Sequence, residues 1–141
     1  MAYPRPRTYT LIVTIPGDNL LDVDDANAKN EIDTDDKLQV IVWRLAPTVP
    51  ANIKFGFPDR DGVGHIWIPG PKPHQNWFRD AYSMEDGRAI GVKVSHHTGL
   101  SNGEWVYMLY AYDVDTGEPY STIYAPDNRT MTVTNPVIIN H

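Results

Sequence analysis

Residues 104–114, EWVYMLYAYDV, are the stretch that decides the fold. Large side chains stand at almost every position, and those two apart share a face because successive residues of a strand point to opposite faces. One face would carry Trp105, Tyr107 and Leu109, and the other Val106, Met108, Tyr110 and Tyr112. The alternation predicts a long β-strand.

Two further segments show strand patterns, and one of them is expected inside a sheet. Residues 8–15 (TYTLIVTI) place threonines on one face and apolar side chains on the other, which predicts a strand with one solvated face. Residues 38–45 (LQVIVWRL) are apolar on both faces, so we expect a central strand. Shorter strands are predicted at 53–57, 89–96, 120–124 and 129–139, and a short helical turn near 24–29.

The sequence predicts one all-β domain that spans residues 1–141. Of its 141 residues, 41% are hydrophobic and 21% are charged, which is ordinary for a globular domain. Seven to eight short strands joined by turns, without a long helical period, predict an antiparallel β-sandwich. Within it, residues 18–36 form an acidic connection, and residues 64–82 form an aromatic loop region rich in proline and glycine. The chain has no cysteine, which excludes disulfides, thiolate metal sites and cysteine nucleophiles.

Three short motifs resemble a known group of proteins. The order of VWRL at 42–45, WVYMLYAYDVDTG at 105–117 and NPVIIN at 135–140 resembles small uncharacterised bacterial β-sandwich proteins of the DP-EP type. Members of that group end in Asp-Pro, an apolar run and asparagine, whereas this chain has Asn135-Pro136. The resemblance covers the C-terminal third and one strand. It implies an immunoglobulin-like or cupredoxin-like sandwich and implies no activity, because that group carries no established chemistry.

The acidic residues gather in one segment. The formal net charge is −6, and residues 18–36 contain eight acidic side chains against one lysine. Such a patch makes nucleic acid an unexpected partner. Three aspartates of the segment match an EF-hand loop, but Asn27 stands where that loop requires glycine, so no EF-hand is expected. An irregular calcium site stays open, and further D-x-D pairs, which fit turns equally well, occur at 59–61 and 113–115.

The sequence predicts a non-enzymatic protein without a cofactor. No serine lies in a G-x-S-x-G motif, and no carboxylate pair adjoins an apolar segment that would separate their pKa values. A histidine-based metal site of a cupredoxin relative is a third alternative, but the spacing matches no known zinc site and we assign no metal ligand. Its candidate ligands would be His65, His74, His96, His97 and His141.

The candidate site lies in residues 65–82, where aromatic rings and polar side chains share a proline-rich segment. Rings beside amide and charged groups suit a protein contact or a sugar, because sugar C–H faces stack on rings while hydroxyls bind the polar groups. We therefore expect a binding or self-assembly module, here a homo-oligomer, with a carbohydrate-binding lectin-like domain as the alternative. A lid over the core is the structural alternative for the same rings. The predicted contact residues are Trp67, His74, Gln75, Asn76, Trp77, Phe78, Arg79 and Tyr82.

A cytoplasmic location is the expectation from the start of the chain. Threonines interrupt the apolar run at 8–15, and no small-residue cleavage pattern follows it. No apolar stretch approaches the roughly 20 residues of a membrane helix, so no membrane span is expected. Unconventional export stays open.

Overall fold

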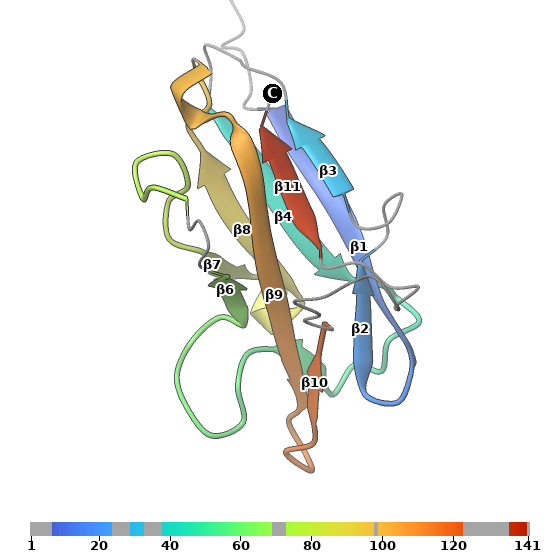
Figure 1. Cartoon of the computed structure of the whole chain (residues 1–141). Helices are drawn as coiled ribbons and strands as arrows, with labels where there is room; N and C mark the ends of the chain where they lie inside the picture. Colours follow the sequence, from blue (N-terminus) through green and yellow to red (C-terminus); the bar gives the residue numbers. More distant parts are fainter. Residues whose placement is uncertain are drawn as a thin grey trace, which may run out of the picture.

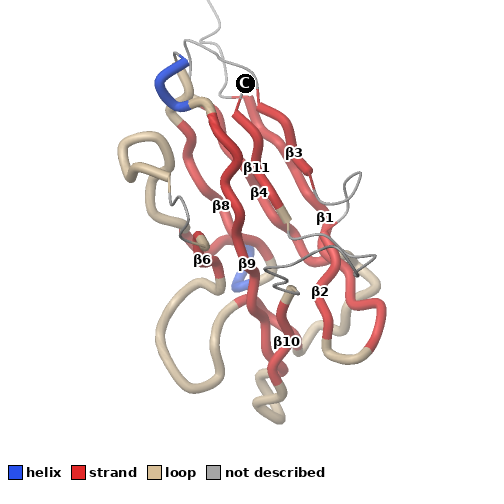
Figure 2. Tube along the Cα trace, viewed as in Figure 1, coloured by secondary structure: helices blue, strands red, loops and turns tan. Residues whose placement is uncertain are grey.

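The computed structural model describes residues 7–23, 29–32, 38–68, 73–97, 99–122 and 136–140. In these residues regular structure consists of strands and two single turns of 3-10 helix, so the all-β prediction is confirmed (Figure 2). None of the described segments forms a helix that is long and apolar enough to cross a membrane. The elements are β1 Arg7–Gly17, β2 Leu20–Val23, β3 Lys29–Ile32, β4 Gln39–Leu45, β5 Ile53–Phe55, β6 His65–Trp67, β7 Tyr82–Met84, η2 Glu85–Gly87, β8 Ala89–Val94, η3 Gly99–Ser101, β9 Gly103–Asp113, β10 Pro119–Ser121 and β11 Val137–Asn140.

β9, predicted from residues 104–114, is the long strand on which the rest of the sheet is organised (Figure 1). It pairs with β11 and β10 along one edge and with β6 and β5 along the other. The strand order is β3-β11-β9-β10-β2-β1-β4-β8-β7, a mixed sheet that curls back on itself until it is nearly closed. As predicted, β4 is central, because it lies between β1 and β8.

The expectation of antiparallel pairing throughout is wrong for three strand pairs. β1 runs parallel to β4 from Arg7↔Gln39 to Val13↔Leu45, and the pairs β2–β10 and β3–β11 are also parallel. Parallel neighbours need a crossover of a dozen or more residues, which a short turn cannot supply. The predicted acidic connection lies between β1 and β4 in the chain, so β4 can begin at the same end of the sheet as β1.

The core lies between β9 with its neighbours in front and β4 and β8 behind (Figure 1). Its largest fully buried side chains include Trp43 and Ile41 of β4, Tyr107 and Leu109 of β9, and Ile90 of β8. Of the two faces that the alternation predicted for β9, the one with Trp105, Tyr107 and Leu109 is therefore the buried one. In β1 as well, the apolar face is buried at Leu11 and Val13 while the threonine side is more exposed.

β5 and β6 lie one after the other on the same edge of β9, separated by a loop at residues 56–64. Both ends of this loop bind one residue: Gly56 N donates to Tyr110 O at 3.0 Å, and Tyr110 N donates to Gly64 O at 2.8 Å. Gly64 has a φ of +92°, and a Cβ there would collide with Tyr110 O and lie 2.6 Å from Gly56 N. Glycine therefore allows the loop to close and places β6 on β9.

Arg88, between η2 and β8, stabilises the segment that joins β4 to β5. Its guanidinium donates to four main-chain carbonyl oxygens at distances of 2.8 to 3.2 Å. One side chain thus binds four carbonyl groups of this segment, two of which, Ala46 O and Pro50 O, also accept from the backbone N–H groups of Val49 and Ile53. The acceptors belong to Ala46, Val49, Pro50 and Ile53.

Several predictions fall partly or wholly outside the described residues. These are the helical turn near 24–29, most of the strand predicted at 129–139, six of the acidic side chains between 18 and 36, and His141. The strand predicted at 120–124 is observed as β10, Pro119–Ser121.

Candidate functional site

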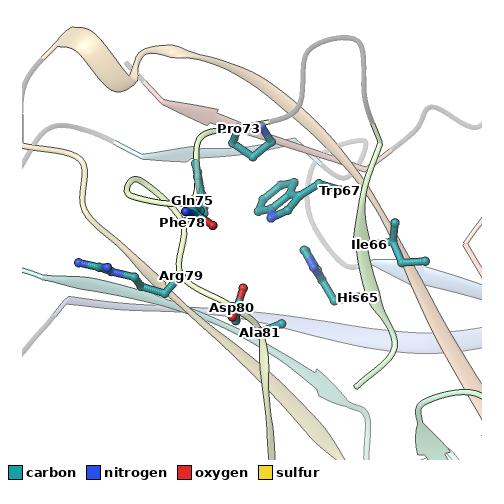
Figure 3. A pocket seen from close by; sticks show the side chains of 9 residues that line it. All are labelled: His65, Ile66, Trp67, Pro73, Gln75, Phe78, Arg79, Asp80 and Ala81. Atoms are coloured by element: carbon teal, nitrogen blue, oxygen red, sulfur yellow. The ribbon is translucent and has the colours of Figure 1, made fainter. Parts of the chain in front are cut away.

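The clearest cleft of the 65–82 region lies between β6 and residues 73–81 (Figure 3). β6 is fixed by its pairing with β9. The opposite wall is fixed to β8, because Phe78 forms a bridge with Val94 and Arg79 N donates to Lys93 O at 2.9 Å. The cleft has a volume of about 290 Å³ and is lined by His65, Ile66, Trp67, Pro73, Gln75, Phe78, Arg79, Asp80 and Ala81.

Three of the aromatic residues predicted for the site, Trp67, Trp77 and Phe78, lie between the core and the cleft region. Phe78 is buried, while Trp67 and Trp77 are half-buried and pack against the core. The Trp67 and Phe78 ring centroids lie 4.8 Å apart in an edge-to-face arrangement, and Trp77 lies 5.9 Å from Trp105. Their rings thus pack as a lid on the core, and two of them, Trp67 and Phe78, also line the cleft.

The polar candidates separate into two groups. Gln75 and Arg79 are exposed and line the cleft. His74 and Asn76 occupy a turn beside it, in which Asn76 N donates to His74 Nδ1 at 3.1 Å. Tyr82 does not line the cleft. Its ring packs against Gly91, and the Lys93 ammonium lies 6.0 Å from the ring centroid. The structure therefore gathers Trp67, Gln75, Phe78 and Arg79, and leaves His74, Asn76, Trp77 and Tyr82 outside the lining.

His65 also lines the cleft, although the sequence suggested it only as a candidate metal ligand. Its ring lies among three aromatic rings, with centroids 4.7 Å from Trp67, 4.9 Å from Trp43 and 5.6 Å from Tyr107. Burial lowers the pKa of His65 to about 3, because the charged imidazolium would lose its hydration there. Its Nε2 atom is buried and has no hydrogen-bond partner.

The sequence did contain a signal for His65. It stands two residues before Trp67, so in a strand the two side chains share a face. Asp80 stands in the sequence among the polar side chains beside the predicted rings, whereas Ala81 carried no signal, because the irregular chain after Phe78 has no repeating period. Their place in the cleft follows from the bonds of this segment to β8.

A second polar cluster is buried away from the cleft. His96 Nδ1 and Ser101 Oγ share a hydrogen bond of 2.5 Å, and Asn140 Nδ2 donates to Ser101 O at 2.9 Å. All three side chains are buried, so the serine hydroxyl is closed to a substrate. The cluster connects the end of β8, η3 and β11, which is a structural role.

In the described part of the chain, no three histidine, aspartate or glutamate side chains lie close enough to hold a metal ion. His65 lies in the cleft, His96 is bound to Ser101, and His74 and His97 are exposed. The irregular calcium site considered for residues 18–36 depends largely on aspartates outside the described residues.

Comparison with known proteins adds no assignment. No protein-family model matches this chain, and neither does any curated protein. The resemblance to proteins of the DP-EP type stays a prediction. Function must therefore be argued from the site itself.

Proposed function

We propose that this protein is a non-enzymatic binding module, and that the cleft between β6 and residues 73–81 takes a small carbohydrate. The observation that carries the proposal is the cleft of about 290 Å³, in which the ring of Trp67 stands among polar side chains. Those polar side chains are Gln75, Arg79 and Asp80 (Figure 3).

The chemistry of the lining suits a neutral hydroxylated ring. An aromatic ring offers a face to sugar C–H groups, while an amide, a guanidinium and a carboxylate supply donors and acceptors for hydroxyls. Arg79 and Asp80 carry opposite charges, so together they favour neither an anion nor a cation. Ligand pockets usually span about 300–1,000 Å³. A cleft of about 290 Å³ is just below that range and suits a single sugar unit.

Titration with monosaccharides tests this proposal. We would add D-glucose, D-galactose, D-mannose and L-fucose separately to the protein and follow backbone amide resonances and tryptophan fluorescence. At least one sugar should shift resonances of β6 and residues 73–81. Gln75→Ala and Asp80→Asn should weaken that binding, because each removes a polar group from the lining.

Asn76→Ala is the matched control for these variants. Asn76 is exposed in the same turn but does not line the cleft, so this change should leave the affinity unaltered. If none of the four sugars binds the wild-type protein, the carbohydrate proposal is wrong.

Self-association is the second candidate, and one observation favours it. β7, which contains Tyr82, is the last strand of the sheet order, and a terminal strand offers main-chain groups to a second copy. Among the described residues, however, the exposed large hydrophobic side chains are Leu100 and Val114, at 82% and 44%, and neither lies in residues 65–82. Mass measured over a range of concentrations decides the question, since a constant monomer mass contradicts self-assembly.

The finer architecture is also a proposal. β9 and β11 lie in front of β4 and β8 in Figure 1, which supports a two-layer sandwich of immunoglobulin-like or cupredoxin-like type. An experimental structure with the complete sheet would test this reading. Direct pairing of β7 with the β3–β11 edge, which would close the sheet into a barrel, would contradict it.

A further inference from the structure

His65 occupies the inner part of the cleft. Its ring projects from β6 toward the space between Trp67 and the segment of Asp80 and Ala81 (Figure 3). Aromatic rings surround it on the core side, as described above. His65 is therefore a polar ring packed at the boundary between the core and the cleft.

The protonation state of His65 determines what its ring can bind. Burial lowers its pKa to about 3, so the imidazole is neutral near neutral pH. A hydrogen bond with the backbone of His65 itself raises the pKa, which is the effect of a ring N–H that donates to a carbonyl. Because Nε2 has no partner, we assign this bond, and the proton of the neutral ring, to Nδ1. The neutral ring then carries its lone pair on Nε2, which is an acceptor.

On the core side of His65, the polar groups of Trp43 and Tyr107 bind each other. Trp43 Nε1 donates to Tyr107 Oη at 2.9 Å in the same aromatic cluster. Buried polar atoms in native proteins nearly always have a partner, so an acceptor without one requires an explanation. Two further buried atoms of the described residues lack partners, Trp105 Nε1 and Asn140 Oδ1, but neither residue lines the cleft.

We propose that a hydroxyl group of the ligand displaces the side chains that cover Nε2 of His65, an atom buried in the ligand-free protein, and donates a hydrogen bond to it. This inference rests on the proposed function and narrows it, because His65 becomes a specificity-determining residue. A carboxylate or phosphate would set its own lone pairs against Nε2 and is disfavoured. A sugar whose innermost hydroxyl is removed or methylated leaves Nε2 without a donor and should bind more weakly.

Two substitutions at His65 separate recognition from packing. His65→Phe keeps a planar ring in the aromatic cluster and removes the acceptor, whereas His65→Gln keeps a polar end that can accept. We expect His65→Phe to bind the sugar found in the four-sugar titration at least about 10-fold more weakly than wild type. His65→Gln should recover part of that loss. Monodeoxy and O-methyl derivatives of the same sugar should lose affinity for wild type and lose little further for His65→Phe.

A second measurement needs no ligand. Long-range ¹H–¹⁵N spectra of the imidazole should show Nδ1 protonated and Nε2 unprotonated at neutral pH, and the Nε2 resonance should shift when the sugar is added. A proton on Nε2 in the free protein would overturn the inference. This readout also decides the matter if His65→Phe fails to fold.

The failures of the two proposals are distinguishable. A sugar that binds wild type and His65→Phe with equal affinity overturns the role of His65 and leaves the carbohydrate cleft standing. The absence of binding by any of the four sugars overturns both.

Discussion

The indole Nε1 of Trp43 donates a hydrogen bond of 2.9 Å to the hydroxyl oxygen of Tyr107, and both side chains are fully buried. Trp43 lies on β4 and Tyr107 on β9, two strands that are not paired with each other. The bond therefore crosses the core between them. Both rings also contact His65, so the relationship supports the inner wall of the candidate cleft.

Tyr107→Phe should lower the free energy of unfolding by about 1–3 kcal/mol, because it leaves Trp43 Nε1 buried without an acceptor. Urea denaturation measures the effect. Tyr110→Phe is the matched control on the other face of β9, where the hydroxyl has a 3.5 Å contact with Met108 Sδ and is partly buried. Equal stability changes for the two variants would show that the bond between Trp43 and Tyr107 contributes nothing specific.

Acid should destabilise the protein through His65. The pKa of His65 is about 3 in the folded protein and 6.5 for the free side chain, so both states are neutral above pH 6.5. Below pH 6.5 the unfolded chain binds a proton and the folded protein does not, and this contribution to stability is lost as the pH falls toward 3. The loss is about 1.4 kcal/mol per pH unit over that window.

His65→Phe is the control for the pH effect, since it removes the titrating group. Urea denaturation between neutral pH and roughly pH 4 should show a steeper loss of stability for wild type than for this variant. The pKa of Asp113 is lower than that of a free aspartate, because hydrogen bonds from Asn52 and from the backbone of Asp115 stabilise its carboxylate. Parallel stability curves for wild type and variant would contradict the burial of the His65 ring.

Arg88→Ala should lower the free energy of unfolding by about 1.5–3 kcal/mol, because four carbonyl oxygens lose a charged donor. Thermal or urea denaturation measures the change. Arg44→Ala is the comparison: Arg44 pairs with Glu85 at 2.7 Å in an exposed ion pair, and such pairs contribute about 0–1 kcal/mol. A loss at Arg44 as large as that at Arg88 would be inconsistent with the carbonyl contacts.

Gly64→Ala should both destabilise the protein and disturb the cleft. The added Cβ would collide with Tyr110 O while the residue keeps a φ of +92°, for a cost of about 2–5 kcal/mol. Because Gly64 precedes β6, amide resonances of His65 and Trp67 should shift as well.

Gly117→Ala controls for the backbone term of this prediction. Gly117 has a φ of +78° and nothing within 4 Å of the built Cβ, so its substitution should cost about 1–2 kcal/mol. If both alanine variants lose the same stability, contact between Gly64 and Tyr110 does not constrain the loop.

Local alternation predicted the parts of the fold that depend on one strand at a time. In β9, Tyr107 and Leu109 share a face as their spacing predicted, because the side-chain period of a strand is set by its own backbone, and the structure shows that this face is the buried one. The central place of β4 followed from apolar residues on both faces. The parallel pairing of β1 with β4 was missed, since the direction of a neighbouring strand depends on how the intervening chain crosses.

For the site, the chain order of residues 65–82 predicted which segment would carry rings beside polar groups, and the structure gathers four of the eight named residues around one cleft. His65 was predicted only as a candidate metal ligand, because its place in the cleft depends on how β6 is held on β9. Likewise, Ser95 is the sequence neighbour of His96, but the serine that forms a hydrogen bond with the His96 ring is Ser101.

The sequence by itself determined an all-β chain without cysteine chemistry, because strand periodicity and residue content are local properties. Tertiary structure alone decided that Trp67 and Phe78 pack on the core while they line a cleft, and that the His65 ring is buried with an unpartnered Nε2. Burial, pKa and hydrogen-bond partners depend on which distant strands meet. In this protein, the hydrogen bonds that close the loop 56–64 on Tyr110 and the pairing of β6 with β9 place the His65 ring in the core.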